Sequence, residues 1–383
     1  MIHRTKFQAI RGFLFISLVI TSCGAPDAAQ KSQPTITPEL PTPSATPTPP
    51  SVLSTSLPIP APTLTVEPAP PDKKVALIYD DDGSRDGTVA LLYLLNHPEF
   101  SIKAICISYG EAHPDVYIQH IGRMLDSFEI QDIPLCPGQD APLSNGTAFP
   151  DWLRQLSDNF WDFPLPNTDK TYPVKNAAEL MVETIKQSPE PVSIFLSGPF
   201  TNLAQALRLD QGIRDNIAAV YFMGGSVHVP GNITNLIPDS GNKVSEWNII
   251  ADPQAAKEVF DSGLDLFMVP LDATNQVILK QDDILPWHQG DEKANLSADL
   301  YDIMFKAYGF ESVEIFDLTA AVLMAKPELC DFQPFHLDIV VVGENNSGQT
   351  VVSPNGEPNI YACLNPSADL IKQELTNHFS GAE

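Results

Sequence analysis

From position 75 onward, short apolar segments alternate with segments that have the periodicity of a helix. The first apolar segment, 75–79, has the length of a strand and no polar alternation, and a helical apolar pattern follows over 89–95. Continuous apolar strands are typical of a sheet covered on both faces, and their alternation with helices favours right-handed βαβ units. The sequence therefore predicts an α/β domain with a mostly parallel, helix-flanked central sheet. Further strands are expected at 103–108, 133–136, 192–196, 218–223 and 265–269, and further helices at 115–129, 201–209, 253–261 and 296–310.

The first 23 residues have the features of a signal peptide. A basic stretch at 3–11 precedes an apolar run at 12–20 that is too short to cross a bilayer as a permanent helix. The run ends in Ile20-Thr21-Ser22-Cys23, which resembles a bacterial lipobox. This resemblance implies cleavage before Cys23 and lipidation of that residue, and a plain secretory signal is the alternative. We therefore expect the chain at the cell surface or the extracytoplasmic face of a bacterial membrane, with Cys23 as its lipid anchor.

A proline-, threonine- and serine-rich segment separates this signal from the predicted domain. Residues 24–72 contain few large apolar side chains and no periodic pattern. Such a composition is typical of a disordered, fairly stiff spacer. The sequence thus predicts three parts: a signal peptide at 1–23, a linker at 24–72 and a folded domain at 73–383.

The net charge restricts the partners of this domain. The 383 residues include 48 acidic and 22 basic side chains, which give a formal charge of −26. A surface this negative repels phosphate backbones and anionic lipid headgroups, so we expect no nucleic-acid partner and membrane contact through Cys23 only. A small neutral ligand and a divalent cation remain compatible with this charge.

Four cysteines remain when Cys23 is set aside. Their even number, in a chain expected outside the cytosol, permits two disulfides among Cys106, Cys136, Cys330 and Cys363. For Cys106, which lies in an apolar strand, simple burial is the favoured interpretation. The spacings fit no zinc motif.

The most unusual segment for chemistry is 80–87, directly after the first expected strand. It reads Asp-Asp-Asp-Gly-Ser-Arg-Asp-Gly, and its four carboxylates repel one another. A Ca²⁺ ion with oxygen ligands would offset this repulsion. A solvated acidic loop that caps the next helix is the alternative, with Asp86 near the helix N-terminus.

This segment resembles the N-terminal signature of the inosine–uridine-preferring nucleoside hydrolases, Asp-x-Asp-Pro-Gly-x-Asp-Asp. Asp80, Asp82 and Asp86 match its acidic positions, whereas its last Asp, normally a Ca²⁺ ligand, is Gly87 here. Further motifs of the family follow in order between about Val75 and Leu375. They are 197–204, similar to the Gly-Pro-Leu-Thr-Asn-Leu-Ala turn; 223–225, 231–232, 246–249 and 251–253, similar to the ribose-binding stretch; 315–320, similar to the His-Asp-Pro-Leu-Ala motif; and 348–352, similar to the closing strand.

The resemblance implies a Rossmann-like sheet of the nucleoside hydrolase type and a Ca²⁺-dependent hydrolysis of the ribosyl C–N bond. A water with lowered pKa would attack the sugar, and carboxylates would stabilise the positive charge that develops on it. The resemblance assigns Asp82 as catalytic base and metal ligand, with Asp317 and the Thr201 carbonyl as further ligands. It assigns the substrate-binding residues as Asp86, Met223, Asn232, Glu246, Asn248 and Phe316. For the four ribose-hydroxyl residues among them (Asp86, Asn232, Glu246 and Asn248), the alternative role is a loop polar group satisfied by the backbone.

Three departures from the family pattern affect this site. Gly87 removes a carboxylate, and Glu111 stands where the family has Asn, so we hypothesise that Glu111 restores the charge as a metal ligand; a solvated loop Glu is the alternative. Phe316 replaces a His beside the leaving base, and a Phe side chain cannot donate a proton. His228 and His113 are candidate acids, although a lone loop His is more often a bystander.

We interpret the chain as a glycosidase that acts on ribonucleosides or a related N-riboside. A ribose- or nucleoside-binding lipoprotein with reduced or lost catalysis is the first alternative, given Gly87 and Phe316, and a hydrolase of another small glycoside is the second. The resemblance also suggests a homo-oligomer.

Overall fold

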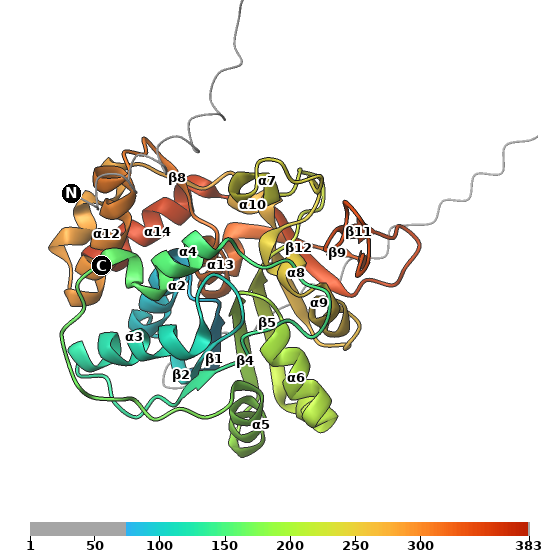
Figure 1. Cartoon of the computed structure of the whole chain (residues 1–383), viewed down its shortest axis with the longest axis horizontal. Helices are drawn as coiled ribbons and strands as arrows, with labels where there is room; N and C mark the ends of the chain where they lie inside the picture. The colour runs from blue at the N-terminus through green and yellow to red at the C-terminus, as the bar shows by residue number, and fades with distance from the viewer. Residues whose placement is uncertain (1–73, 382–383) are drawn as a thin grey trace, which may run out of the picture. The chain divides into compact units, whose positions relative to one another are not determined.

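A computed structural model describes residues 74–381, and its centre is an eight-stranded sheet (Figure 1). All neighbouring strands run parallel except the last pair, in which β9 is antiparallel to β12. The predicted mostly parallel sheet is thus confirmed, with one antiparallel edge. In sheet order the strands are β3 (Leu135–Pro137), β2 (Phe100–Ile107), β1 (Val75–Asp81), β4 (Val192–Ser197), β5 (Ile217–Met223), β6 (Leu266–Val269), β12 (Ile360–Pro366) and β9 (Cys330–Phe335).

Helices cover both faces of this sheet, because consecutive strand residues point to opposite sides. In β1, Leu77 and Tyr79 pack into one apolar core, whereas Ala76 and Ile78 pack into a second. Figure 1 shows helices on either side of the central strands. The first core contains α2 (Arg85–Asn96), α3 (Pro114–Ser127), α12 (Glu292–Asp302), α13 (Asp317–Ala325) and α14 (Ala368–Ser380), and the second contains α5 (Ala177–Gln187), α6 (Thr201–Leu209) and α9 (Pro253–Phe260).

The remaining elements are short and connect these layers. They include two small antiparallel strand pairs outside the central sheet, in which β10 pairs with β11 and β7 pairs with β8. These elements are α4 (Asp151–Asp158), α7 (Ile233–Leu236), α8 (Trp247–Ala251), α10 (Leu271–Thr274), α11 (Gln281–Ile284), β7 (Ile278–Leu279), β8 (Val313–Glu314), β10 (Leu337–Ile339) and β11 (Thr350–Val352).

Most expected elements are present, with small shifts at their ends. The helix expected at 201–209 has the bounds of α6, and the one expected at 296–310 is α12 followed by a π-helical turn, Ile303–Ala307. A strand does form within the expected segment 348–352, as β11, but it pairs with β10 outside the central sheet. The first strand is longer than the expected 75–79. It continues through Asp80 and Asp81, because its pairing with β2 and β4 extends that far.

The strand order reverses between β1 and β4. From β1 the chain proceeds outward through β2 to β3, and from β4 it proceeds the other way through β5 to β6. The carboxyl ends of two strands that diverge in this way form a crevice in which ligands of open α/β sheets bind. The acidic segment begins at the end of β1 and therefore lies at the place where a ligand is expected to bind.

Two disulfides join the edge strands of the sheet to their neighbours. Cys106–Cys136 links β2 to β3, and Cys330–Cys363 links β12 to β9. The two permitted disulfides are therefore present. The interpretation of Cys106 as a simply buried residue is wrong, because β2 and β3 pair in a register that places Cys106 opposite Cys136.

Removal of either disulfide is expected to destabilise the domain. The bonds close segments of 30 and 33 residues, and loop-closure entropy for such lengths gives about 3 to 4 kcal/mol each. Thermal unfolding of the Cys330→Ala/Cys363→Ala variant should occur several degrees below that of the wild type. A reductant should lower the wild-type Tm further than that of a variant lacking both pairs. A wild-type Tm that reductant leaves unchanged would show that the bonds contribute little.

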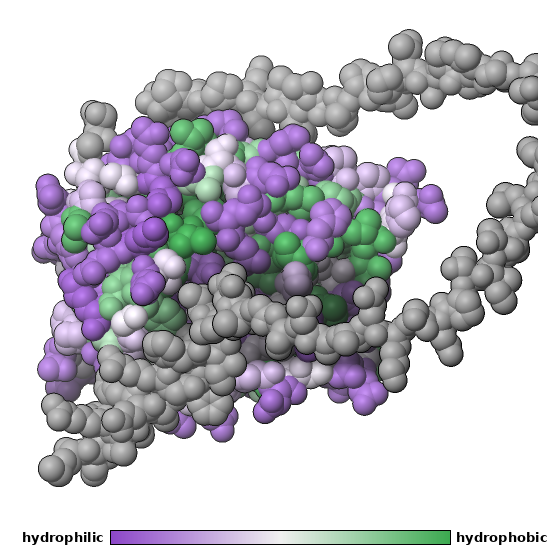
Figure 2. Space-filling view, turned by 90° about the horizontal axis from the view of Figure 1, so that it is seen from above, coloured by the Kyte–Doolittle hydropathy of each residue, from purple (hydrophilic) through white to green (hydrophobic). Residues whose placement is uncertain are grey.

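The predicted signal peptide at 1–23 and linker at 24–72 lie outside the residues that the structure describes. Within 74–381, no helix combines the length and the apolar character that crossing a membrane requires. Figure 2 shows one face of this part of the chain, on which hydrophilic residues predominate and hydrophobic residues form separate patches. This distribution agrees with the acidic composition.

Candidate active site

Asp82 is held at the carboxyl end of β1 by two closely approaching backbone segments. Its carboxylate oxygen Oδ2 accepts a hydrogen bond from the backbone N–H of Glu111 at 3.3 Å. A side chain at Gly110 or Gly198 would lie within 2.8 Å of Asp82 atoms, so both positions require glycine for this approach. The loops that follow β2 and β4 thereby fix the Asp82 carboxylate in the crevice.

The start of α13 meets the acidic segment across more than 200 residues of sequence. The Ser84 hydroxyl donates to Asp317 Oδ2 at 2.9 Å. One oxygen of Asp86 accepts the backbone N–H groups of Phe316 and Asp317, each at 2.6 Å, and the other accepts the Tyr301 hydroxyl. The Asp86 carboxylate thus satisfies free N–H groups at the N-terminus of α13 and positions Asp317 beside Ser84. The structure therefore brings together the two distant acidic segments that the sequence singled out.

The carboxylates of this crevice are buried and repel one another. Burial is the main cause that raises the pKa of Asp82 and Asp317 well above the ordinary value, and each is raised further by the charge of Asp81. Burial likewise raises the pKa of Asp81 and Glu111 to about 7. No positively charged side chain is among the main influences on the pKa of Asp82 or Asp317. The charge of Arg85 acts instead on Asp86 and Glu111.

The donor set fits a divalent cation with oxygen ligands. Asp82 is 2% exposed, and its Oδ1 atom has no hydrogen-bond partner. An unpartnered buried carboxylate oxygen is costly, and a hard cation such as Ca²⁺ satisfies oxygen ligands of this kind. Asp82 and Asp317 are the residues that would hold such an ion. Within 74–381, the oxygens of Asp82 and Asp317 do not form a group with a third carboxylate in which all ligand atoms lie within 4.8 Å of one another. Such spacing is expected, because like charges repel.

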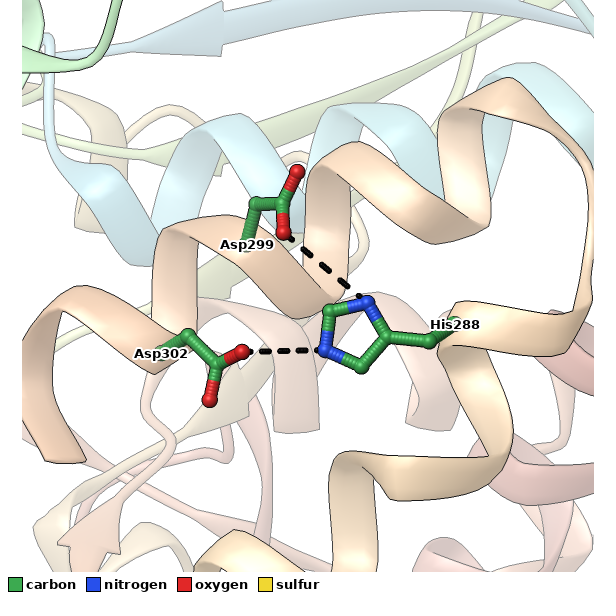
Figure 3. A group of neighbouring side chains, drawn as sticks. All are labelled: His288, Asp299 and Asp302. Atoms are coloured by element: carbon green, nitrogen blue, oxygen red, sulfur yellow. Dashed lines mark hydrogen bonds and ion pairs between the residues drawn. The ribbon is translucent and has the colours of Figure 1, made fainter. Parts of the chain in front are cut away.

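One compact group of three possible ligand atoms does occur among the described residues, away from the crevice. Figure 3 shows it as His288, Asp299 and Asp302. His288 Nε2 lies 3.0 Å from Asp302 Oδ2, and His288 Nδ1 lies 3.8 Å from Asp299 Oδ1. Lys306 also binds Asp302 Oδ2. Because a lysine cation already occupies this carboxylate, the group is an ion-pair network within the α12 region.

Three of the four expected ribose-hydroxyl residues gather near the end of β5, whereas Asp86 contacts the start of α13. Glu246 accepts the backbone N–H groups of Gly225 at 2.9 Å and of Asn248 at 3.0 Å, so it caps α8. The Asn248 amide donates to the Met223 carbonyl at 3.1 Å, and Asn232 Oδ1 accepts the Trp247 N–H at 3.2 Å. The charge of Glu246 contributes to the raised pKa of Asp82, so this group adjoins the acidic crevice. The backbone bonds hold the polar side chains in place beside it.

Three other predicted site residues have clear partners. Thr201 is fully buried at the first turn of α6, and its hydroxyl donates to Asp252 at 2.7 Å. The Glu111 carboxylate accepts the Ser157 hydroxyl at 2.9 Å. Phe316 is partly buried at the edge of the first core, directly before Asp317. Their roles as metal ligands or base contacts remain predictions.

The two histidine candidates for the leaving-group acid lie in different surroundings. His113 is 42% exposed and pairs with Asp158 at 2.7 Å. The ring of His228 packs edge-on against Phe335, and its backbone N–H binds Asp272. No contact joins either ring to Asp82 or Asp317 in the described part of the chain. The structure gives neither histidine a position beside the predicted base.

Sequence reasoning missed two residues that complete the crevice. The sequence places Asp81 only within an acidic segment, but this residue ends β1, is 1% exposed and lies against Gly87 of α2. Ser84 caps α2 through the Gly87 N–H and also donates to Asp317. The signal for Ser84 was the N-cap preference for serine before a helical pattern.

Comparisons with known proteins agree with this architecture. Residues 77–373 match the family described as inosine-uridine preferring nucleoside hydrolase. The chain is 31% identical over 283 residues to a pyrimidine-specific ribonucleoside hydrolase RihA from Enterobacter sp., covering 72% of this chain and 87% of the relative. It is also 31% identical over 287 residues to the protein of that name from Shewanella oneidensis, covering 72% and 86%.

Solved structures show the same fold. A purine-preferring ribonucleoside hydrolase from Gardnerella vaginalis superposes with a TM-score of 0.69 and 22% identity, over 80% of this chain and 98% of that one. An inosine-uridine preferring nucleoside hydrolase from Bacillus anthracis superposes with a TM-score of 0.67 and 21% identity, over 80% and 100%. With the acidic crevice at the sheet's switch point and the matching family over most of 74–381, the chain belongs to the inosine–uridine-preferring nucleoside hydrolases, enzymes that hydrolyse the N-glycosidic bond of nucleosides.

Proposed function

We propose that this chain hydrolyses pyrimidine ribonucleosides with a water molecule that a divalent cation and Asp82 activate together. The observation that carries the proposal is the buried Asp82 carboxylate, whose Oδ1 atom has no hydrogen-bond partner. The charge of this carboxylate also acts on Asp317 and contributes to its raised pKa. The names of the relatives that are 30 to 31% identical support the pyrimidine preference. Ca²⁺ is the proposed ion, because carboxylate and carbonyl oxygens are its usual ligands.

The residues divide into those that hold the ion and those that hold the sugar. Asp82, Asp317 and the Thr201 carbonyl would bind the cation, whereas Glu111, whose carboxylate accepts the Ser157 hydroxyl, is not included among these ligands. When bound, such an ion lowers the pKa of an attacking water. Asp82 would serve as the general base that accepts the proton of the attacking water. Its buried position keeps the carboxylate in one orientation and excludes bulk water from it.

The sugar side of the crevice stabilises the charge that develops during bond cleavage. Loss of the base leaves positive charge on the ribose ring, and nearby carboxylates lower the energy of that state. Glu246 and Asp86 supply these charges, and Asn232 and Asn248 supply amides for the ribose hydroxyls. Met223, whose carbonyl accepts the Asn248 amide, would contact the sugar beside them. Because the backbone already positions these side chains, little ordering is required when the substrate binds.

Phe316 would lie against the leaving base. Its ring offers an apolar face for stacking and no proton, so this residue does not serve as the leaving-group acid. This arrangement requires a base that departs without protonation by residue 316. Replacement of Phe316 by Ala should raise KM more than it lowers kcat, as checked by steady-state kinetics with uridine.

The function is tested by ribose release from a panel of nucleosides. Uridine and cytidine should be hydrolysed faster than inosine by the full-length chain in the presence of Ca²⁺. Faster release from inosine would overturn the pyrimidine preference. Binding of uridine without any release would instead support the binding-protein alternative, which the hydrolase relatives do not favour.

We also propose that the chain is a lipoprotein on the extracytoplasmic side of a bacterial membrane. The lipobox-like sequence ending in Cys23 and the two disulfides support this location, since disulfides persist in oxidising compartments. Mass spectrometry of the mature N-terminus should find a lipidated Cys23, and Cys23→Ser should release the chain from membranes. An unmodified Cys23 in the mature protein would contradict the anchor. The family resemblance further suggests a homo-oligomer, which light scattering would measure.

A further inference from the structure

The space beside Gly87 is filled by the side chain of Asp81. A Cβ atom built on Gly87 would lie 1.8 Å from Asp81 Oδ1 and 2.6 Å from Asp81 Cγ. No side chain at position 87 fits while Asp81 keeps this conformation. A carboxylate from the end of β1 thus lies where the family signature has a carboxylate from the first turn of α2.

The Asp81 side chain is oriented by two donors, one backbone N–H and one hydroxyl. Its Oδ2 atom accepts the Gly83 N–H at 2.8 Å, and its Oδ1 atom accepts the Ser197 hydroxyl at 3.0 Å. The Ser84 hydroxyl, which donates to Asp317, lies 3.5 Å from Asp81 Oδ1. These bonds leave further lone pairs on the Asp81 oxygens, because each carboxylate oxygen can accept two.

Asp81 also shares the charge environment of the two principal ligands. Its charge acts on both Asp82 and Asp317, so the three carboxylates belong to one buried group. The unpartnered Oδ1 atom of the 2%-exposed Asp82 indicates, independently of the acidic cluster, that the group accepts a further ligand. In contrast, the Glu111 carboxylate is bound by Ser157 on α4, and its contact with Asp82 is made by the backbone.

We propose that Asp81 replaces the missing carboxylate of position 87 as a ligand of the divalent cation. This inference rests on the proposed function. Asp81 and Gly87 form a reciprocal pair: the acidic side chain comes from the adjacent strand end, and the glycine at position 87 leaves room for it. The site thereby keeps the number of carboxylates of the family signature.

Calcium titration calorimetry of single variants tests the ligand directly. Asp81→Asn keeps the size and most hydrogen bonds of the side chain and removes its charge, so Ca²⁺ affinity should fall at least about tenfold. Glu111→Gln is the matched control, which removes a nearby carboxylate charge, and it should change the Ca²⁺ affinity by less than about threefold. Unchanged affinity in Asp81→Asn, with or without a loss in Glu111→Gln, would overturn the proposal.

An exchange of the two positions gives a test that does not depend on one substitution. Gly87→Asp alone should bind Ca²⁺ poorly and unfold at a lower temperature, because its side chain collides with Asp81. Asp81→Ala alone should also bind poorly. The double variant Asp81→Ala/Gly87→Asp should recover affinity to within a few-fold of the wild type, together with the Ca²⁺-dependent rise in Tm. A double variant that binds no better than Asp81→Ala would contradict the reciprocal pair.

Ca²⁺ binding by the wild-type chain distinguishes a failure of this inference from a failure of the proposed function. If the wild-type chain binds no divalent cation, the metal-dependent mechanism fails as a whole. If the wild type binds Ca²⁺ and Asp81→Asn binds it equally well, only the role of Asp81 fails.

Discussion

Replacement of Asp82 by asparagine is expected to lower kcat for uridine hydrolysis by about a thousandfold or more. A positioned general base contributes about 10²- to 10⁴-fold, and Asp82 would also lose its charge as a metal ligand. Steady-state kinetics at saturating Ca²⁺ measure this loss. Because asparagine has nearly the same shape and still accepts the Glu111 N–H, the fold should persist.

Asp302→Asn is the matched control for this substitution. Asp302 is also a buried carboxylate, at 7% exposure, but its partners are His288 and Lys306 in the group of Figure 3. Its variant should keep kcat within about threefold of the wild type while losing some stability. Equal losses of kcat in the two variants would show that the effect reflects folding rather than the role of Asp82.

Without divalent cations, the domain is expected to lose stability as the pH rises from about 5 to 8. Burial raises the pKa of Asp80 to about 8 and those of Asp81, Glu111 and Glu246 to about 7 in the folded state. The unfolded chain has already ionised these groups near pH 4. The folded state therefore holds more protons in this pH range, and the free energy of unfolding falls as they are released.

Thermal unfolding in chelator should show a drop in Tm on the order of 10 °C across that range, since several groups contribute. In saturating Ca²⁺ the drop should be much smaller, because the ion favours the ionised carboxylates of the folded state. Burial lowers the pKa of His97 and His378 to about 4, so these two histidines oppose the loss below pH 6.5 without cancelling the effect of the four carboxyl groups. Identical curves with and without Ca²⁺ would contradict a cation in the crevice.

The sequence was sufficient for the parallel sheet and for the grouping of the two acidic segments. Strands such as β4 are continuous apolar runs, and α6 begins at Thr201 as expected, because burial on both faces imposes a clear pattern. The strand-end rule placed the 80–87 segment at the binding edge of the sheet, whereas the position of Asp317 in the site was implied only by the family resemblance. The family resemblance then supplied the residue assignments.

The role of Asp81 could not be predicted, because it depends on the direction of a side chain. Three successive aspartates alternate across the sheet end: Asp80 binds Asn202 on α6, whereas Asp81 points to α2. Only the extension of β1 through Asp81 fixes this alternation, and the pattern of apolar residues ends at Tyr79. The Cys106–Cys136 bond was missed for a related reason, since it depends on the register of β2 with β3.

The most direct test is the rate of ribose release from uridine by the full-length chain, measured after removal of divalent cations and again after return of Ca²⁺. The rate should fall at least about a hundredfold in chelator and recover with one bound ion per chain. An undiminished rate in a sample shown by elemental analysis to contain no divalent metal would contradict the assignment of the buried carboxylates as a cation site.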